Sequence, residues 1–256
     1  MKSTFSTPGF LWPLLTLICT ITVLYGLSKA LKKTSWSTSK KQSLFIGITF
    51  ILLSWAALLT VLSYDGFFSD FSKLPPRPAL ALLIPLPFVL GFAFSKTGTQ
   101  LLQQVPSYWL VLMQSFRIAV EVLLWFAFLA GKLPIQMSFE GRNYDMLTGI
   151  LALPAGYLLM KKKTYLPAIV IAFNIAGILL LLNIIIIAVL SMPTPFRYFM
   201  NEPSNILVAQ FPFILLPGVL VPLAYSLHIL SLRQLYIQEN TVATVISPKK
   251  PYVLQD

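Results

Sequence analysis

Residues 167–190 decide the fold class, because they form an apolar run without a single charged side chain: PAIVIAFNIAGILLLLNIIIIAVL. A helix rises about 1.5 Å per residue, so about 20 such residues cross the ~30 Å hydrocarbon core of a bilayer. The rest of the chain has the same character, since 57% of its 256 residues are hydrophobic and only 11% are charged. A soluble domain carries roughly a quarter charged residues. The sequence therefore predicts an integral membrane protein.

Apolar blocks of this kind recur along the chain and predict an all-α, polytopic bundle of seven transmembrane helices within one membrane domain, residues 1–233. We expect these helices at about 10–30, 44–64, 78–94, 108–130, 145–160, 167–190 and 206–232. The fifth is the shortest of them and contains Gly149, Pro154 and Gly156. Residues 234–256 are too few to bury a core of their own and are expected to form a short cytoplasmic tail.

The distribution of lysine and arginine predicts the orientation, because cytoplasmic loops carry an excess of these residues. With seven helices, the basic residues other than Arg117 divide twelve against six between the two sides. The richer side holds Lys29, Lys32, Lys33, Lys40, Lys41, Lys96, Lys161, Lys162, Lys163, Arg233, Lys249 and Lys250. The poorer side holds Lys2, Lys73, Arg77, Lys132, Arg142 and Arg197. We therefore expect the N-terminus outside and the C-terminus in the cytoplasm.

The same distribution explains the net charge of +11 without nucleic acid. Basic residues at helix ends face anionic lipid headgroups, so membrane lipids are the expected partners. Cys19 is the only cysteine and His228 the only histidine, which excludes an internal disulfide and sites built from several histidines. No cofactor, no metal site and no catalytic residue is predicted. His228 is expected about one turn from the cytoplasmic end of its helix, where a snorkelling role is favoured over a ligand or haem-binding role.

Polar side chains inside the apolar blocks are the strongest functional signal, because a charge at the bilayer centre is costly and normally has a partner. Arg117 and Glu121 are four residues apart, on one face of the fourth helix, where they can form an ion pair. Asn183 is expected at a depth similar to that of Glu121, with Asn174 deeper and Gln210 near the outer end of the last helix. Each amide alone is typical of interhelical hydrogen bonding. Together with the charged pair they predict a polar cavity open to the outside.

The outer loop before the fifth helix carries a second group of candidate residues. Glu140, Arg142, Asn143 and Asp145 place mixed charge within six positions around a turn at Gly141. Asn143 or Asp145 can cap the helix that follows. Two interpretations of this loop are open: a capped helix start with ion pairs within the loop, which is favoured, or a rim or lid over the cavity. The ligand-binding candidates are Arg117, Glu121, Asn183, Glu140, Arg142, Asn143, Asp145 and His228.

Two stretches of the chain carry a family resemblance. They are FRIAVEVLLWFAFLAGKLPIQMSFEGRNYDMLTGI, residues 116–150, and FPFILLPGVLVPLAYSLHILSLRQL, residues 211–235. Both resemble uncharacterised seven-helix membrane proteins of bacteria. This resemblance implies a protein of the bacterial inner membrane and the same residues of interest, but no activity.

Four functions remain open at this stage. The first is a membrane protein that binds or senses a small molecule around Arg117 and Glu121. The alternatives are a structural or assembly partner of another membrane protein, a transporter, and an intramembrane enzyme. Transport is less favoured because no internal repeat is visible. Catalysis is less favoured because Glu121 and His228 are expected at different depths.

Overall fold

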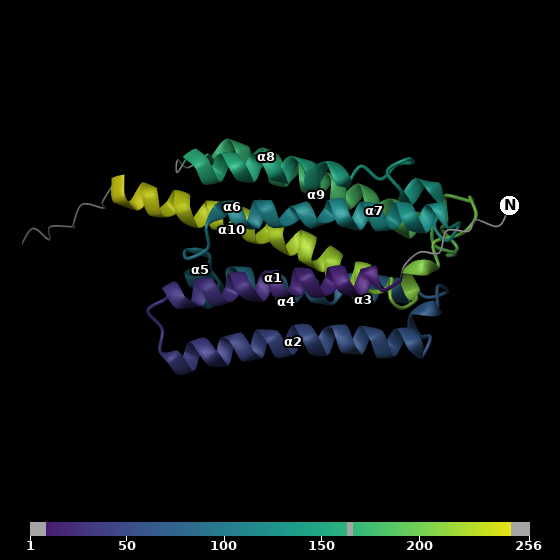
Figure 1. Cartoon of the computed structure of the whole chain (residues 1–256), viewed down its shortest axis with the longest axis horizontal. Helices are drawn as coiled ribbons and strands as arrows, with labels where there is room; N and C mark the ends of the chain where they lie inside the picture. Colours follow the sequence, from purple (N-terminus) through teal and green to yellow (C-terminus); the bar gives the residue numbers. More distant parts are fainter. Residues whose placement is uncertain (1–8, 163–165, 247–256) are drawn as a thin grey trace, which may run out of the picture.

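The structure is a computed structural model that describes residues 9–162 and 166–246. Regular secondary structure in these two ranges is entirely helical, which confirms the all-α prediction (Figure 1). The helices are α1 (Leu11–Lys33), α2 (Thr38–Tyr64), η1 (Phe67–Ser69), α3 (Arg77–Leu83), α4 (Pro85–Phe94), α5 (Lys96–Leu102), α6 (Ser107–Leu112), η2 (Met113–Ser115), α7 (Phe116–Leu129), η3 (Ile135–Met137), α8 (Met146–Lys162), α9 (Pro167–Leu190), η4 (Leu207–Ala209), η5 (Leu216–Leu220) and α10 (Val221–Ile246).

Within the described ranges, six helical segments are long and apolar enough to cross a membrane. They are Leu11–Lys33, Thr38–Tyr64, Arg77–Phe94, Ser107–Leu129, Pro167–Leu190 and Leu216–Asn240. The apolar part of α8, Met146–Lys161, is shorter than these six. Length and composition therefore indicate a membrane-integrated helical bundle. The sequence predicts seven spanning helices. The additional one corresponds to α8, which is too short to be counted with these six.

Three of these six segments are built from more than one helix, and one of the three, Leu216–Asn240, joins η5 to α10. Pro85 lacks a backbone N–H and divides one segment into α3 and α4. The segment that carries Arg117 is divided by η2 into α6 and α7. The short helix α5 follows α4 and is capped by Ser95, whose hydroxyl accepts a hydrogen bond from the backbone N–H of Gly98.

The last helix lies further along the chain than the sequence predicts. Residues 206–215 are not part of α10, which is preceded instead by the short π-helix η5. The helix then continues to Ile246, well into the stretch expected as a cytoplasmic tail. Polar residues become frequent after Leu232, so the sequence pattern predicts the end of the helix there. Residues 247–256 of that tail, together with Lys2, Lys163, Lys249 and Lys250, lie outside the described residues.

Helix α8 packs against α6, η2 and α7 along a stripe of small residues. A methyl group on Gly149 would lie 2.9 Å from the backbone nitrogen of Ile118. One on Gly156 would lie 2.4 Å from the side chain of Leu112. Ala152, between them, is fully buried. Small residues at this spacing allow two helix backbones to approach closely, which is how apolar helices associate where no water is expelled.

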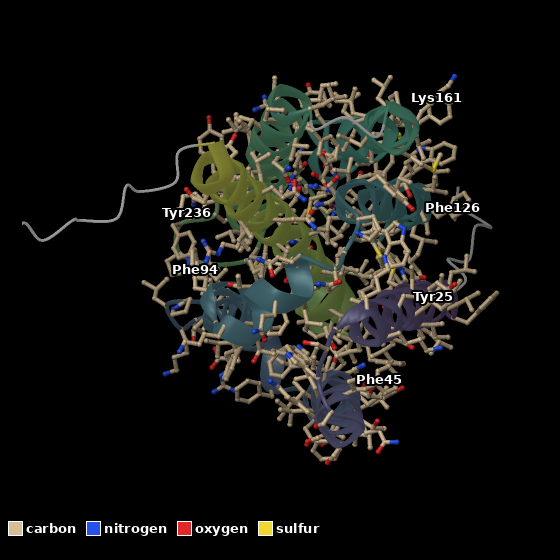
Figure 2. The ribbon with its side chains drawn as sticks, turned by 90° about the vertical axis from the view of Figure 1, so that its left-hand side faces the viewer. Tyr25, Phe45, Phe94, Phe126, Lys161 and Tyr236 are labelled. Atoms are coloured by element: carbon tan, nitrogen blue, oxygen red, sulfur yellow. The ribbon has the colours of Figure 1, made fainter. Side chains whose placement is uncertain are left out.

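Described segments that the sequence predicts to be rich in basic residues lie near one end of the bundle. Figure 1 shows α5 and the C-terminal end of α10 near one end, with α3 and the end of α7 near the other. Helix α2 lies at the periphery, where Figure 2 places Phe45 at the edge of the bundle. Only Leu59 of α2 is buried. The indole N–H of Trp55 attaches this helix by donating a 2.7 Å hydrogen bond to the carbonyl oxygen of Gly218.

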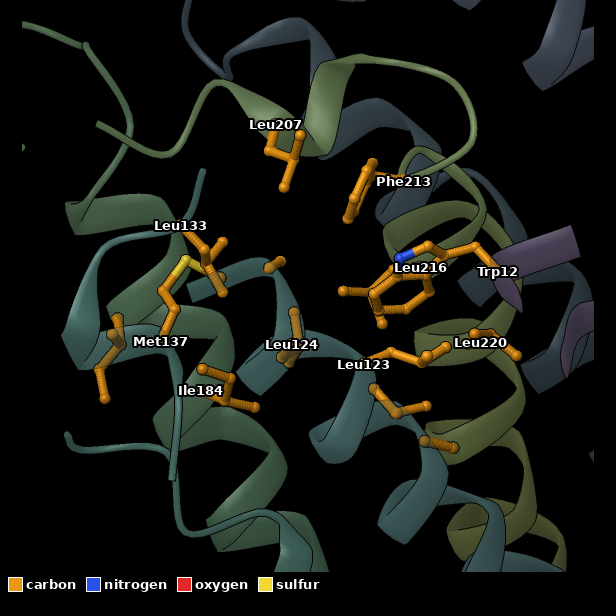
Figure 3. Close-up of a cluster of buried hydrophobic side chains, with 14 of the residues drawn as sticks. Trp12, Leu123, Leu124, Leu133, Met137, Ile184, Leu207, Phe213, Leu216 and Leu220 are labelled. Atoms are coloured by element: carbon orange, nitrogen blue, oxygen red, sulfur yellow. The ribbon is translucent and has the colours of Figure 1, made fainter. Parts of the chain in front are cut away.

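The largest apolar cluster lies among α1, α7, α9, η4, η5 and the segment after α7 (Figure 3). Trp12 of α1 and Phe213 pack together at a ring-centroid distance of 5.2 Å, beside Leu216. Leu133 and Met137 enter the same cluster, although they belong to the connection between α7 and α8. This connection is therefore folded into the bundle and does not extend into solvent.

Candidate functional site

An ion pair between Arg117 of α7 and Asp145, the residue before α8, lies at the centre of the site. The Nε of Arg117 donates a 2.7 Å hydrogen bond to Oδ2 of Asp145, and its Nη2 donates to Oδ1. The exposed fractions of the two residues are 1% and 5%. The sequence predicts an ion pair between Arg117 and Glu121. The structure shows instead a bidentate ion pair between Arg117 and Asp145. Such a pair satisfies the flat guanidinium group better than an i, i+4 contact does.

His228 of α10 continues the cluster on the other side of Arg117. Its Nε2 lies 3.1 Å from Nη1 of Arg117, and its Nδ1 lies 2.9 Å from Oδ1 of Asn174. A guanidinium group can only donate, so Nε2 must be the accepting nitrogen and Nδ1 must carry the proton. The imidazole in this arrangement is therefore neutral, with a defined tautomer.

Asn174 extends the chain of hydrogen bonds towards the other end of α10. Its amide nitrogen donates to the hydroxyl of Ser231 at 2.9 Å and to the carbonyl oxygen of Val170 at 2.8 Å. Both Asn174 and His228 are almost fully buried, at 1% and 0% exposed. The polar chain thus links α7, the residue before α8, α9 and α10 through buried side chains.

The contact between Arg117 and His228 corrects the depths expected from the sequence. Because α10 continues to Ile246, His228 lies well inside its helix and not one turn from the end. Gly177 of α9 makes room for the ring, since a methyl group there would lie 2.4 Å from Cε1 of His228. Close approach of α9 to α10 at this level therefore requires glycine.

Glu121 lies one helical turn beyond Arg117 and is held by Asn143. The amide nitrogen of Asn143 lies 2.8 Å and 2.7 Å from the two carboxyl oxygens of Glu121, and 3.0 Å from the carbonyl oxygen of Met137. The amide oxygen of Asn143 accepts a 3.1 Å bond from the N–H of Asp145. Asn143 therefore fixes both carboxyl-bearing segments relative to each other.

Glycine is required at one position of the loop that brings Asn143 into the bundle. A methyl group on Gly141 would lie 2.2 Å from the carbonyl oxygen of Ile135. The N–H groups of Gly141 and Asn143 both lie within hydrogen-bond distance of the carbonyl oxygen of Ser138, at 3.0 Å and 3.3 Å. The loop is consequently a tight, buried turn that presents Asn143 to Glu121.

A cavity of about 80 Å³ adjoins the cluster, between α3, α7, α9 and the η5–α10 segment. Arg117, Glu121 and Asp145 are the ionisable residues among those that line it. Apolar side chains form the remainder of its wall, among them Leu82 of α3 and Ile185 of α9. The sequence predicts a polar cavity here. The structure shows an apolar one with a charged end.

The remaining predicted site residues lie outside this cavity. The amide nitrogen of Asn183 donates a 2.9 Å bond to the carbonyl oxygen of Arg142, which joins α9 to the loop. The guanidinium group of Arg142 is exposed and lies over the ring of Phe199. Glu140 is also exposed and accepts a 2.6 Å hydrogen bond from the indole N–H of Trp125. These three residues form part of the outer surface of the loop and its attachment.

Sequence reasoning missed several polar residues of the interior. Ser231 was not singled out, although it follows His228 by three residues and therefore lies on the same helical face. Gln114 of η2, three residues before Arg117, is a further buried polar residue. Its amide nitrogen donates a 3.1 Å bond to the carbonyl oxygen of Ala224 and ties η2 to α10. Among the described residues, no group of three or more histidine, cysteine, aspartate or glutamate side chains is placed to hold a metal ion.

Residues 78–236, more than half of the chain, match the family described as a domain of unknown function (DUF8737). The chain belongs to this family. The matched range begins in α3 and ends within α10, so it contains the whole polar cluster and every residue that lines the cavity. It also contains both stretches that carry the family resemblance. No curated protein and no solved structure matches the chain.

Proposed function

We propose that the protein binds or senses a small molecule in the cavity beside Arg117, Glu121 and Asp145. The observation that carries this proposal is the cavity itself, whose apolar wall ends at three ionisable side chains inside an apolar bundle. Small-molecule sites are typically apolar pockets with a few convergent polar groups. Ionisable residues at membrane depth are costly and therefore mark functional sites more often than other buried residues do.

Within this proposal the predicted site residues have different roles. Arg117, Glu121 and Asp145 line the cavity and contact the ligand. Asn143 and His228 position them, because the first holds the Glu121 carboxyl group and the second accepts from Arg117. Glu140 and Arg142 belong to the loop that covers this end of the bundle, Asn183 attaches this loop to α9, and the three form the rim of the entrance.

The proposal places the chain in the bacterial inner membrane as seven spanning helices, with the N-terminus outside, the C-terminus in the cytoplasm and the cavity facing outward. The inner membrane follows from the family resemblance, and the orientation follows from the excess of basic residues on one side. Helix α8 is counted as spanning because it packs along α6, η2 and α7 and ends in a lysine-rich segment.

Cysteine accessibility tests this topology. Cys19 is buried, so a new cysteine at exposed Tyr198 or Lys96 can be labelled against a silent background. A membrane-impermeant thiol reagent applied to intact cells from which the outer membrane has been removed is expected to label Tyr198→Cys but not Lys96→Cys. If both positions are labelled, or neither is, they lie on the same side and α8 does not cross.

The binding proposal is tested by filling the cavity. Ala188 of α9 lines it, and Ala188→Leu adds three carbon atoms to its wall. The matched control is Ala57→Leu on the exposed face of α2. Melting temperatures of the purified proteins are measured in mild detergent across a panel of small metabolites and lipids. A compound that stabilises the wild type and Ala57→Leu but not folded Ala188→Leu occupies the cavity.

The opposite result favours a structural role. Arg117, His228 and Asn174 already satisfy one another, as expected of polar contacts that only join helices. If every stabilising compound acts equally on Ala188→Leu, or no compound in the panel stabilises the wild type, the binding proposal is wrong. The assembly-partner function then takes its place.

A further inference from the structure

The two carboxyl groups that line the cavity differ in their partners. Asp145 is paired with Arg117 through both of its oxygens. Among the described residues, no basic side-chain nitrogen lies within 4 Å of the Glu121 carboxyl group, whose hydrogen-bond donor is the neutral amide of Asn143. With Glu121 ionised, the cluster would therefore contain one positive and two negative charges beside a neutral imidazole.

The carboxyl group of Glu121 also retains free hydrogen-bonding capacity towards the cavity. A carboxylate has about four lone-pair positions, and Asn143 supplies a single donor nitrogen to both oxygens. Because the residue is only 1% exposed, bulk water does not solvate it. A buried charge of this kind needs a partner of opposite sign, or it must be neutralised.

We infer that the cavity binds an aliphatic ammonium ion, with its charged nitrogen at Glu121 and its carbon chain along the apolar wall formed by α3, α9 and α10. This inference rests on the proposed binding function and names the ligand class for the same site. An ammonium group carries three donors and one positive charge, which matches the unpaired carboxylate. A carboxylate or phosphate ligand would instead raise the excess of negative charge.

The size of the cavity limits the part of the ligand that it encloses. A cavity of about 150 Å³ holds a benzene molecule, whereas this one has about 80 Å³. It therefore fits an ammonium group with a few carbon atoms, and n-propylamine is a suitable probe. Propionate and 1-propanol have the same chain with a negative and a neutral end group, and they serve as matched comparisons.

The test compares these three probes by titrating each against the melting temperature of the purified protein in mild detergent. A phosphate buffer at pH 7 avoids competing amines and keeps the amine and the carboxylate ionised. The three probes are applied to the wild type, to Glu121→Gln and to Glu239→Gln, which removes an exposed carboxylate far along α10. The dependence of melting temperature on probe concentration yields the affinity.

We expect propylamine to stabilise the wild type and Glu239→Gln, with propionate ineffective and propanol weaker. Glu121→Gln is expected to weaken propylamine binding by about ten- to a hundredfold, as for the loss of one charge-assisted hydrogen bond, and to leave propanol binding unchanged. Should Glu121→Gln fail to fold, the wild-type preference for the amine over its two analogues still decides the question.

Other outcomes separate this inference from the proposed function. If all three probes bind the wild type equally, or propionate binds best, the ammonium class is wrong while the cavity remains a binding site. If none of the three binds, the ammonium class is again wrong. The Ala188→Leu comparison with the larger panel then decides independently whether the cavity binds any molecule.

Discussion

We predict that removing one partner of the buried ion pair of Arg117 and Asp145 causes a large loss in the free energy of unfolding. Asp145→Asn preserves the shape of the side chain but removes the charge that neutralises Arg117. The side chains of the two residues are 2% and 7% exposed, so the guanidinium group cannot turn to water when its partner is lost. Removing one member of a buried pair costs about 3–5 kcal/mol, which is roughly a 10²- to 10⁴-fold change in the folding equilibrium.

The measurement is the free energy of unfolding in mixed micelles, from titration with a denaturing detergent and helicity as the signal. The control is Asp70→Asn, which removes the carboxylate from the ion pair of Asp70 and Arg77. In that pair the side chains are 26% and 33% exposed, so water replaces the lost partner and the loss is expected to be much smaller. A double variant, Arg117→Met with Asp145→Leu, should be more stable than Asp145→Asn because it leaves no unpaired charge.

One result would refute this reasoning. If Asp145→Asn loses no more stability than Asp70→Asn, the guanidinium group of Arg117 is not dependent on Asp145. The buried network would then not be the element that holds α7 against the start of α8. A double variant less stable than the single one would lead to the same conclusion, because the penalty of an unpaired charge would be absent.

Two further predictions follow from local geometry. Gly177→Ala should destabilise the bundle by about 1–3 kcal/mol, because its methyl group would lie 2.4 Å from Cε1 of His228. Gly47→Ala in α2, where no atom lies within 4 Å of the added carbon, should be neutral or slightly stabilising in the same unfolding assay. The second prediction concerns pH, since a hydrogen bond from Arg197 lowers the pKa of Glu202 below its usual 4.5. The stabilising contribution of Glu202 is therefore present above about pH 4.5 and is lost as the pH falls through the lower folded pKa. The difference in stability between wild type and Glu202→Gln should shrink on acidification, and a constant difference would contradict the assignment.

Much of the architecture follows from local sequence pattern. The run without charges at 167–190 has the same bounds as helix α9, because apolar composition and the proline at its start act within the segment itself. The end of the last helix was misjudged because polarity after Leu232 looks like the end of a membrane segment, although polar residues can continue a helix beyond the bilayer. The length of an apolar run therefore predicts which part of a helix lies in the bilayer better than it predicts the last residue of the helix.

The candidate site was only partly predictable. Sequence pattern was enough to predict that Arg117 and Glu121 are buried on one helical face, because they are four residues apart in an apolar helix and a charge within a bilayer needs a partner. The partners of these two residues became visible only in the packed helices. The loop that carries Asn143 and Asp145 folds into the bundle through a turn that requires Gly141, and α10 brings His228 to Arg117 past Gly177. Those contacts join residues from separate helices, and the spacing of residues along one helix contains no information about which distant segment will pack against it.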